Sequence, residues 1–195
     1  MTERHQIARA GAILVATNAL EDPNFARTVI YLLEHSLHGS LGVILNRPSE
    51  LSVGRALPEW KSVVTDPAVL FNGGPMEPGG VLALGRQTAS SPPATAPVEG
   101  AGWTDLGGDL GAIDLSAGPA GLGVPLDNLR LFQGYSGWGT RQLDAELSAG
   151  AWWVFHALPS DIFSIQPAQL RERVVRRQGA AWSAFLHAPD DASLN

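Results

Sequence analysis

The chain has 195 residues, of which 45% are hydrophobic and 16% charged, and its 13 basic and 19 acidic side chains give a formal net charge of −6. A chain of this length buries about 70% of its unfolded surface, so a hydrophobic core can stabilise one domain over residues 1–195 without disulfides. Cysteine is absent, which excludes thiol nucleophiles and metal sites with thiolate ligands. The acidic balance is the opposite of that expected for a dedicated nucleic-acid binder.

The apolar runs of the chain are short. The longest, residues 10–16 and 29–33, fall far below the roughly 20 residues that cross a bilayer. The first run follows Arg4 and Arg9, but no small-x-small cleavage site comes after it. We therefore expect a cytoplasmic protein with no membrane partner.

The N-terminal quarter predicts a strand, a turn and a hairpin. Residues 11–16 form a continuous apolar run between turn formers, which is typical of a buried central strand. Residues 22–24, Asp-Pro-Asn, predict a helical turn, because Asp caps free amides and Pro fits the first helical position. Residues 28–33 and 41–45 are rich in β-branched side chains, and the loop between them, residues 36–40, suits a hairpin.

The rest of the chain mixes strands and helices. Apolar side chains at helical spacing predict helices over residues 52–60, 138–149 and 167–178, the second ended by Gly150. Short apolar or β-branched runs predict strands over residues 68–71, 80–84, 110–115, 129–133 and 152–155. Residues 86–109 carry three prolines and few large apolar anchors, so we predict a flexible loop there.

Two segments suggest catalytic chemistry at first sight. Residues 134–138 nearly match the G-x-S-x-G nucleophile elbow, but Trp138 stands where the second glycine must allow close packing. We interpret this segment as a tight turn from strand to helix, with Trp138 in the core. His35 and His38 lack an identifiable third ligand, so we interpret them as surface or hydrogen-bonding residues. We expect no catalytic residue, no metal site and no cofactor.

A polar cleft is a second possibility. Gln142 and Glu146 lie four residues apart and share a helix face. Together with Arg27, Asn46 and Arg47 they could line a cleft for a small ligand. Alternatively, Gln142 and Glu146 lie on a solvated helix face, and Asn46 and Arg47 belong to a turn that ends a strand. The sequence leaves both interpretations open.

Four arginines gather in the C-terminal predicted helix, and such a cluster could contact the phosphates of a nucleic acid. Glu172 dilutes the cluster, and the net charge of the chain is negative. An ordinary charged helix face is the favoured interpretation, so nucleic acid is a disfavoured partner. The arginines are Arg171, Arg173, Arg176 and Arg177.

Four blocks of sequence closely resemble the bacterial YqgE/AlgH family. They are residues 22–35, residues 39–48, the Gly-Gly-Pro at 73–75, and residues 134–152. The resemblance implies a mixed α+β fold, in which a branched β-sheet, partly closed as a small barrel, is surrounded by helices. It also implies a cytoplasmic protein without accepted catalytic residues, and the AlgH name carries a link to transcriptional regulation of alginate synthesis.

The leading hypothesis is a non-enzymatic regulatory or adaptor protein that binds a protein partner or a small ligand. The alternatives are a small-ligand-binding protein or enzyme with a polar cleft, and a DNA-binding transcriptional regulator. The family blocks supply the candidate binding residues, which are Asp22, Asn24, Arg27, Asn46, Arg47, Gly73, Gly74, Tyr135, Gln142 and Glu146.

Overall fold

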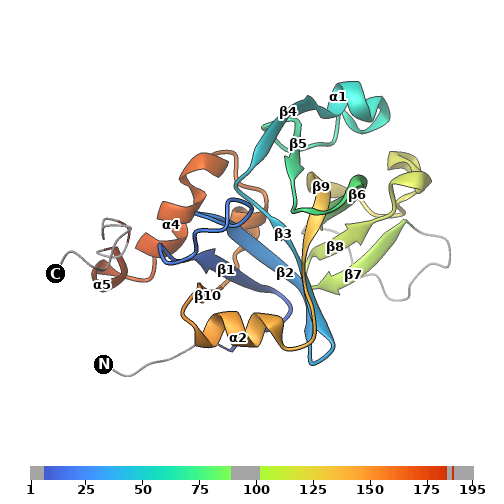
Figure 1. Cartoon of the computed structure of the whole chain (residues 1–195). Helices are drawn as coiled ribbons and strands as arrows, with labels where there is room; N and C mark the ends of the chain where they lie inside the picture. Colours follow the sequence, from blue (N-terminus) through green and yellow to red (C-terminus); the bar gives the residue numbers. More distant parts are fainter. Residues whose placement is uncertain (1–6, 89–101, 184–185, 187–195) are drawn as a thin grey trace.

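A computed structural model describes residues 7–88, 102–183 and 186 (Figure 1). Its strands form one sheet in the order β10-β1-β2-β3-β9-β6-β8-β7, with β4 and β5 branching from it. The strands are β1 (Ala12–Ala16), β2 (Val29–Ser36), β3 (Gly39–Ile44), β4 (Pro48–Ser52), β5 (Val69–Asn72), β6 (Met76–Gln87), β7 (Trp103–Gly107), β8 (Leu110–Ile113), β9 (Leu126–Trp138) and β10 (Trp152–His156).

The branch of the sheet lies on β9. One edge of β9 pairs with β6 through most of its length. On the other edge, β5 runs parallel to residues 132–133, and β3 runs antiparallel to residues 136–138. The branched sheet implied by the family resemblance is therefore present, and apart from the β5–β9 pair its ladders are antiparallel.

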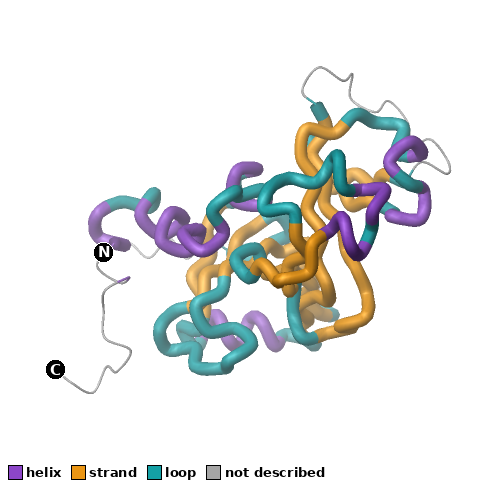
Figure 2. Tube along the Cα trace, turned by 90° about the horizontal axis from the view of Figure 1, so that it is seen from above, coloured by secondary structure: helices purple, strands orange, loops and turns teal. Residues whose placement is uncertain are grey.

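The sheet curls into a half-barrel, but the helices do not surround it as expected (Figures 1 and 2). α1 contacts β4 and β5, while α2 contacts β3 and β10, so each covers only one end of the sheet. None of the helices in the described ranges is both long and apolar enough to cross a membrane. The helices are α1 (Val53–Ala56), α2 (Gln142–Ser148), α3 (Pro159–Ile162), α4 (Leu170–Arg176) and α5 (Ala180–Ser183).

Most predicted strands are confirmed. β1 is buried at every residue because its two faces pack into two different core clusters, and β10 and β2 pair with its two edges, as expected for a central strand. The predicted hairpin is present as β2 and β3. The predicted C-terminal helix is a 3-10 turn (Pro167–Gln169) followed by α4, which buries Leu170 and Val174.

The predicted helix over residues 52–60 is shorter than expected. It consists of α1 and a separate 3-10 turn (Pro58–Trp60), because the residue before a proline avoids helical backbone angles. Leu57 accordingly has φ −141° and ψ 74°. Strand β4, which precedes α1 and pairs with β5, was not predicted.

The prediction of a tight turn at residues 134–138 was wrong. All five residues belong to β9, and Trp138 is its last residue rather than the start of a helix. α2 begins only at Gln142. The expectation that Trp138 is a core residue is confirmed, since its side chain is 4% exposed.

The predicted loop over residues 86–109 is also corrected at its ends. β6 continues through Gln87, and β7 pairs with β8 from Trp103 onward. The indole of Trp103 lies over Gly111, where a Cβ atom would be 2.3 Å from the ring, so β7 and β8 pack together through a cross-strand contact. Residues 89–101 lie outside the described residues.

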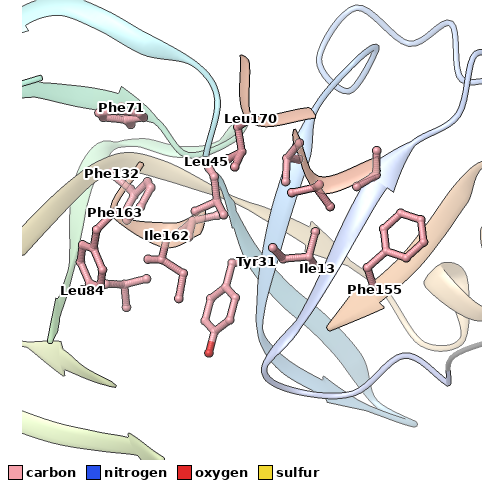
Figure 3. Packing of buried hydrophobic residues seen from close by; sticks show 14 of the residues in the cluster. Ile13, Tyr31, Leu45, Phe71, Leu84, Phe132, Phe155, Ile162, Phe163 and Leu170 are labelled. Atoms are coloured by element: carbon pink, nitrogen blue, oxygen red, sulfur yellow. The ribbon is translucent and has the colours of Figure 1, made fainter. Parts of the chain in front are cut away.

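The largest core cluster joins the two halves of the sheet (Figure 3). Figure 3 shows Leu45 and Ile162 between a group that contains Phe132 and a group that contains Ile13. Ile162 comes from α3, so the C-terminal segment helps to fill the space enclosed by the curled sheet.

We predict that Gly74→Ala destabilises the protein by about 3 kcal/mol or more. A Cβ at position 74, where φ is +153°, would lie 2.2 Å from the backbone carbonyl carbon of Tyr135. Gly79→Ala is the matched control, because nothing lies within 4 Å of its Cβ position. Urea unfolding of both variants checks the prediction, and equal stabilities would contradict it.

Candidate ligand-binding site

The first two family blocks hold one loop, residues 22–27, against the sheet. The Arg47 guanidinium donates to the carbonyl oxygens of Pro23, Asn24 and Ala26, at 2.9, 2.8 and 3.2 Å. The Asn46 side chain accepts from the amide of Val29 and donates to the carbonyl of residue 27. The predicted Asp cap is present, because the carboxylate of residue 22 accepts from the amide of residue 24 at 2.8 Å.

Glu146 joins the last family block to this loop. Its Oε2 accepts hydrogen bonds from the indoles of Trp138 and Trp152, at 2.9 and 2.8 Å. Its Oε1 accepts from Gln142 at 3.0 Å, as expected for neighbours on one helix face. The ring of Phe25 contacts both indoles, with centroid distances of 6.0 and 5.9 Å. The structure therefore brings these blocks together in a packed cluster.

The remaining candidate residues surround the branch of the sheet. Gly73 and Gly74 pack on β9 with no room for a side chain. The hydroxyl of Tyr135 is 3.4 Å from a carboxylate oxygen of Glu77. The exposed Arg27 has φ +61°.

None of the ten candidate residues lines either of the two cavities described below. His35 bonds to the Ser40 hydroxyl at 2.7 Å and lies 3.7 Å from Asp144. Within the described ranges no three histidine or acidic side chains gather as a metal site would require.

The C-terminal arginines contact the protein itself. Arg177 forms an ion pair with the buried Asp161 at 2.6 Å, and Arg171 donates to the carbonyl of residue 16. Arg176 pairs with Glu172, one turn earlier in α4. The interpretation of this group as a charged helix face therefore fits its contacts.

A different place in the structure brings two arginines to one cavity. A cavity of about 460 Å³ lies between the β6–β9 pair and the C-terminal helices. Arg86 and Asn128 line it from the sheet, where they face each other across the ladder. Phe163, Ser164 and Ile165 line it from the segment that follows α3, and Arg173 lines it from α4.

The guanidinium of Arg86 has N–H donors that make no hydrogen bond to a described residue. No described residue accepts a hydrogen bond from it, and its Nε is buried without a partner. The carboxylates of Asp109 and Asp127 lie 3.9 and 3.8 Å away, too far for hydrogen bonds. Both aspartate side chains are partly exposed, at 48% and 40%, and ion pairs near the surface contribute only about 0–1 kcal/mol. A ligand anion can therefore compete for this guanidinium.

Arg173 is partly engaged. One of its terminal nitrogens donates to the Ser164 hydroxyl at 2.9 Å and approaches the carbonyl of Ser160 at 3.5 Å. Its other terminal nitrogen and Nε make no bond to a described residue, so this guanidinium also retains donors toward the cavity.

A third arginine is buried behind the cavity wall. Arg130 is 1% exposed and donates to the carbonyls of Ser164 and Asp66, at 2.9 and 2.8 Å. Its guanidinium lies 4.2 Å from the centroid of Phe71, and its Nε has no partner. Burial lowers the pKa of Arg130 to about 10, an effect that the Asp66 carboxylate opposes, so the side chain stays charged at neutral pH.

Sequence reasoning missed two of these residues. Arg86 falls in the predicted flexible loop, so it was not considered for a site. Arg130 stands within the apolar run of residues 129–132. A charge inside a predicted strand was a usable signal, because buried charges are rare unless they are paired or functional. Arg173 was noted only as part of the C-terminal cluster.

A smaller cavity of about 120 Å³ lies where the two ends of the curled sheet approach each other. It is lined by Tyr31, Asp109 and Leu158, among others. Burial raises the pKa of Tyr31, so its hydroxyl remains a neutral donor at physiological pH.

The fold defines the class of this protein: a branched, half-closed sheet accompanied by a few short helices. The model of the AlgH-like family (DUF179) matches residues 13–183. The chain belongs to this family, which confirms the resemblance seen in its sequence.

Relatives match along nearly the whole chain. A UPF0301 protein of Streptomyces coelicolor is 42% identical over 185 residues, covering 95% of this chain and 94% of the relative. A UPF0301 protein of Mycobacterium tuberculosis is 38% identical, covering 97% and 92%.

Two solved structures are similar as well. A crystal structure of a protein from Corynebacterium diphtheriae has a TM-score of 0.84 at 31% identity and covers 93% of each chain. The solution structure of AlgH from Pseudomonas aeruginosa has a TM-score of 0.66 at 28% identity, and covers 98% of this chain and all of AlgH. These likenesses support the half-barrel architecture but assign no activity.

We predict that Glu146→Ala lowers the free energy of unfolding by about 2–4 kcal/mol, because it leaves two buried indole N–H groups without an acceptor. Glu146→Gln keeps an acceptor oxygen and loses only about 1 kcal/mol. Glu172→Gln, in an exposed helix pair, is the control and changes stability by less than about 0.5 kcal/mol. Urea unfolding measures all three, and an unaffected Glu146→Ala protein would contradict the assignment.

Proposed function

We propose that this protein is a non-enzymatic, cytoplasmic ligand-binding protein of a regulatory or adaptor kind, and that its ligand is a small anion held in the cavity between Arg86 and Arg173. The observation that carries the proposal is Arg86, a cavity-lining guanidinium without a hydrogen-bond acceptor among the described residues. Guanidinium groups suit carboxylates and phosphates because their donors form a planar fork.

The lining of the cavity favours binding over catalysis. Its described lining side chains are arginine, asparagine, serine, proline, phenylalanine and isoleucine, and the neighbouring carboxylates of Asp109 and Asp127 form ion pairs with Arg86 rather than line the cavity. The hydroxyl of Ser164 already accepts from Arg173 and from the amide of Gln166. A role as a sensor of a metabolite anion would be consistent with a regulatory protein.

We predict that inorganic phosphate stabilises the protein against heat, by about 3 °C at a concentration roughly ten times its Kd. Arg86→Gln and Arg173→Gln each remove most of this shift, because each deletes a cationic wall of the cavity. Arg55→Gln, on exposed α1, alters the net charge equally and keeps the shift. Melting curves with and without phosphate test the proposal. Identical shifts in the unmodified protein and all three variants would contradict it.

We also predict no sequence-selective DNA binding at physiological salt. The net charge of −6 repels a polyanion, and the C-terminal arginines make contacts within the protein. A gel-shift titration with genomic fragments tests this, and a sub-micromolar, sequence-selective complex would establish the DNA-binding alternative instead.

A further inference from the structure

We infer that the ligand of the Arg86–Arg173 cavity is a phosphomonoester with a compact apolar group. This inference rests on the function proposed above and specifies the chemistry of the ligand. It follows from three properties of the cavity: its volume, the number of donors it presents, and the apolar side chains on its rim.

The volume indicates more than a free ion. About 460 Å³ falls in the range of roughly 300–1,000 Å³ typical of pockets for organic ligands. An inorganic anion bound by two guanidinium groups would leave much of this space to water. The ligand therefore carries an organic part beyond its anionic group.

The donors indicate a phosphate rather than a carboxylate. Arg86 has carboxylates at 3.9 and 3.8 Å but no hydrogen bond to a described residue, and Arg173 retains unused donors. The two side chains reach the cavity from different elements, β6 and α4. A carboxylate presents two oxygens in one plane and a single charge, whereas a phosphomonoester presents three terminal oxygens in different directions and a charge near −2, which suits two guanidinium groups that come from different elements. The buried charge of Arg130 behind the wall adds to the attraction for a dianion.

The rim indicates an apolar substituent. Ile165 is 69% exposed and lines the cavity, so it offers an apolar surface next to the two arginines. Pro159 lines the same cavity, and Phe163 forms its buried floor at 5% exposure. An aromatic or short aliphatic group placed here would remove the exposed side chain of Ile165 from water.

The test is isothermal titration of the full chain with inorganic phosphate, phenyl phosphate, benzoate and phenol. We expect phenyl phosphate to bind at least about tenfold more tightly than inorganic phosphate or benzoate, and phenol not to bind. Ile165→Ser should weaken phenyl phosphate about fivefold and leave inorganic phosphate unchanged. Leu37→Ser removes an equally exposed apolar side chain in the β2–β3 hairpin and serves as the control.

The outcomes separate this inference from the proposed function. If phenyl phosphate and inorganic phosphate bind equally, and both need Arg86, the inference fails while the anion site stands. If benzoate matches phenyl phosphate, the ligand is a carboxylate and the phosphate assignment is overturned. If no anion binds, or if Arg86→Gln changes none of the affinities, both the inference and the proposed function are wrong.

Discussion

Strand β9 pairs with three strands although it has only two edges. At the branch, where two of these strands meet on one edge, the backbones approach closely, and this close approach constrains the rest of the fold. β6 occupies one edge, so β3 and β5 share the other. Where the shared edge changes partner, the chain at Gly73 and Gly74 touches the backbone of β9 at Gly134 and Tyr135. Side chains at 73, 74 or 134 would collide with main-chain atoms, so the branch can form only with glycine there.

The branch determines where both the packed cluster and the cavity lie. Beyond it, the end of β9 leads toward α2, and Glu146 ties the indoles of β9 and β10 to Phe25. Before it, the β6–β9 pair presents Arg86 and Asn128 to the returning C-terminal helices. The two regions use different stretches of one strand, which is why residues that stabilise the fold and residues free to bind a ligand are spatially distinct.

Burial of Arg130 behind the cavity destabilises the charged form of its side chain. Lowering its pKa to about 10 corresponds to a penalty of roughly 3 kcal/mol for the charged form, fully present at neutral pH. The charged guanidinium donates to two carbonyl oxygens and lies against the face of Phe71, while its Nε has no partner among the described residues. An anion bound in the adjoining cavity would relieve part of this penalty, which links occupancy to stability.

The sequence predicts the local features of this fold well. β1, the β2–β3 hairpin and β10 follow from composition alone, because each is an apolar run that needs only its own residues to be recognised. Residues 134–138 were misread, since glycines that permit close packing of strands look like glycines that permit a turn. β7 was missed because Trp103 packs over Gly111, a contact that only the folded chain creates.

The candidate site could not be predicted from the sequence, because its residues also come together only in the folded chain. The family blocks concentrate polar residues such as Arg47 and Glu146, and the structure shows these making several hydrogen bonds within the fold. Arg86 and Arg173 are 87 positions apart in the sequence and come to line one cavity only in the folded chain. No spacing rule can find such a pair.

The central claim is that stability and ligand binding reside in different residues, and one paired measurement tests it. Melting temperatures of Glu146→Gln and Arg86→Gln are compared in the absence and presence of phenyl phosphate. The account predicts that Glu146→Gln melts lower than the unmodified protein but keeps the full ligand-induced rise, while Arg86→Gln melts near it and loses the rise. The reverse pattern, with the rise lost in Glu146→Gln and kept in Arg86→Gln, would contradict the account.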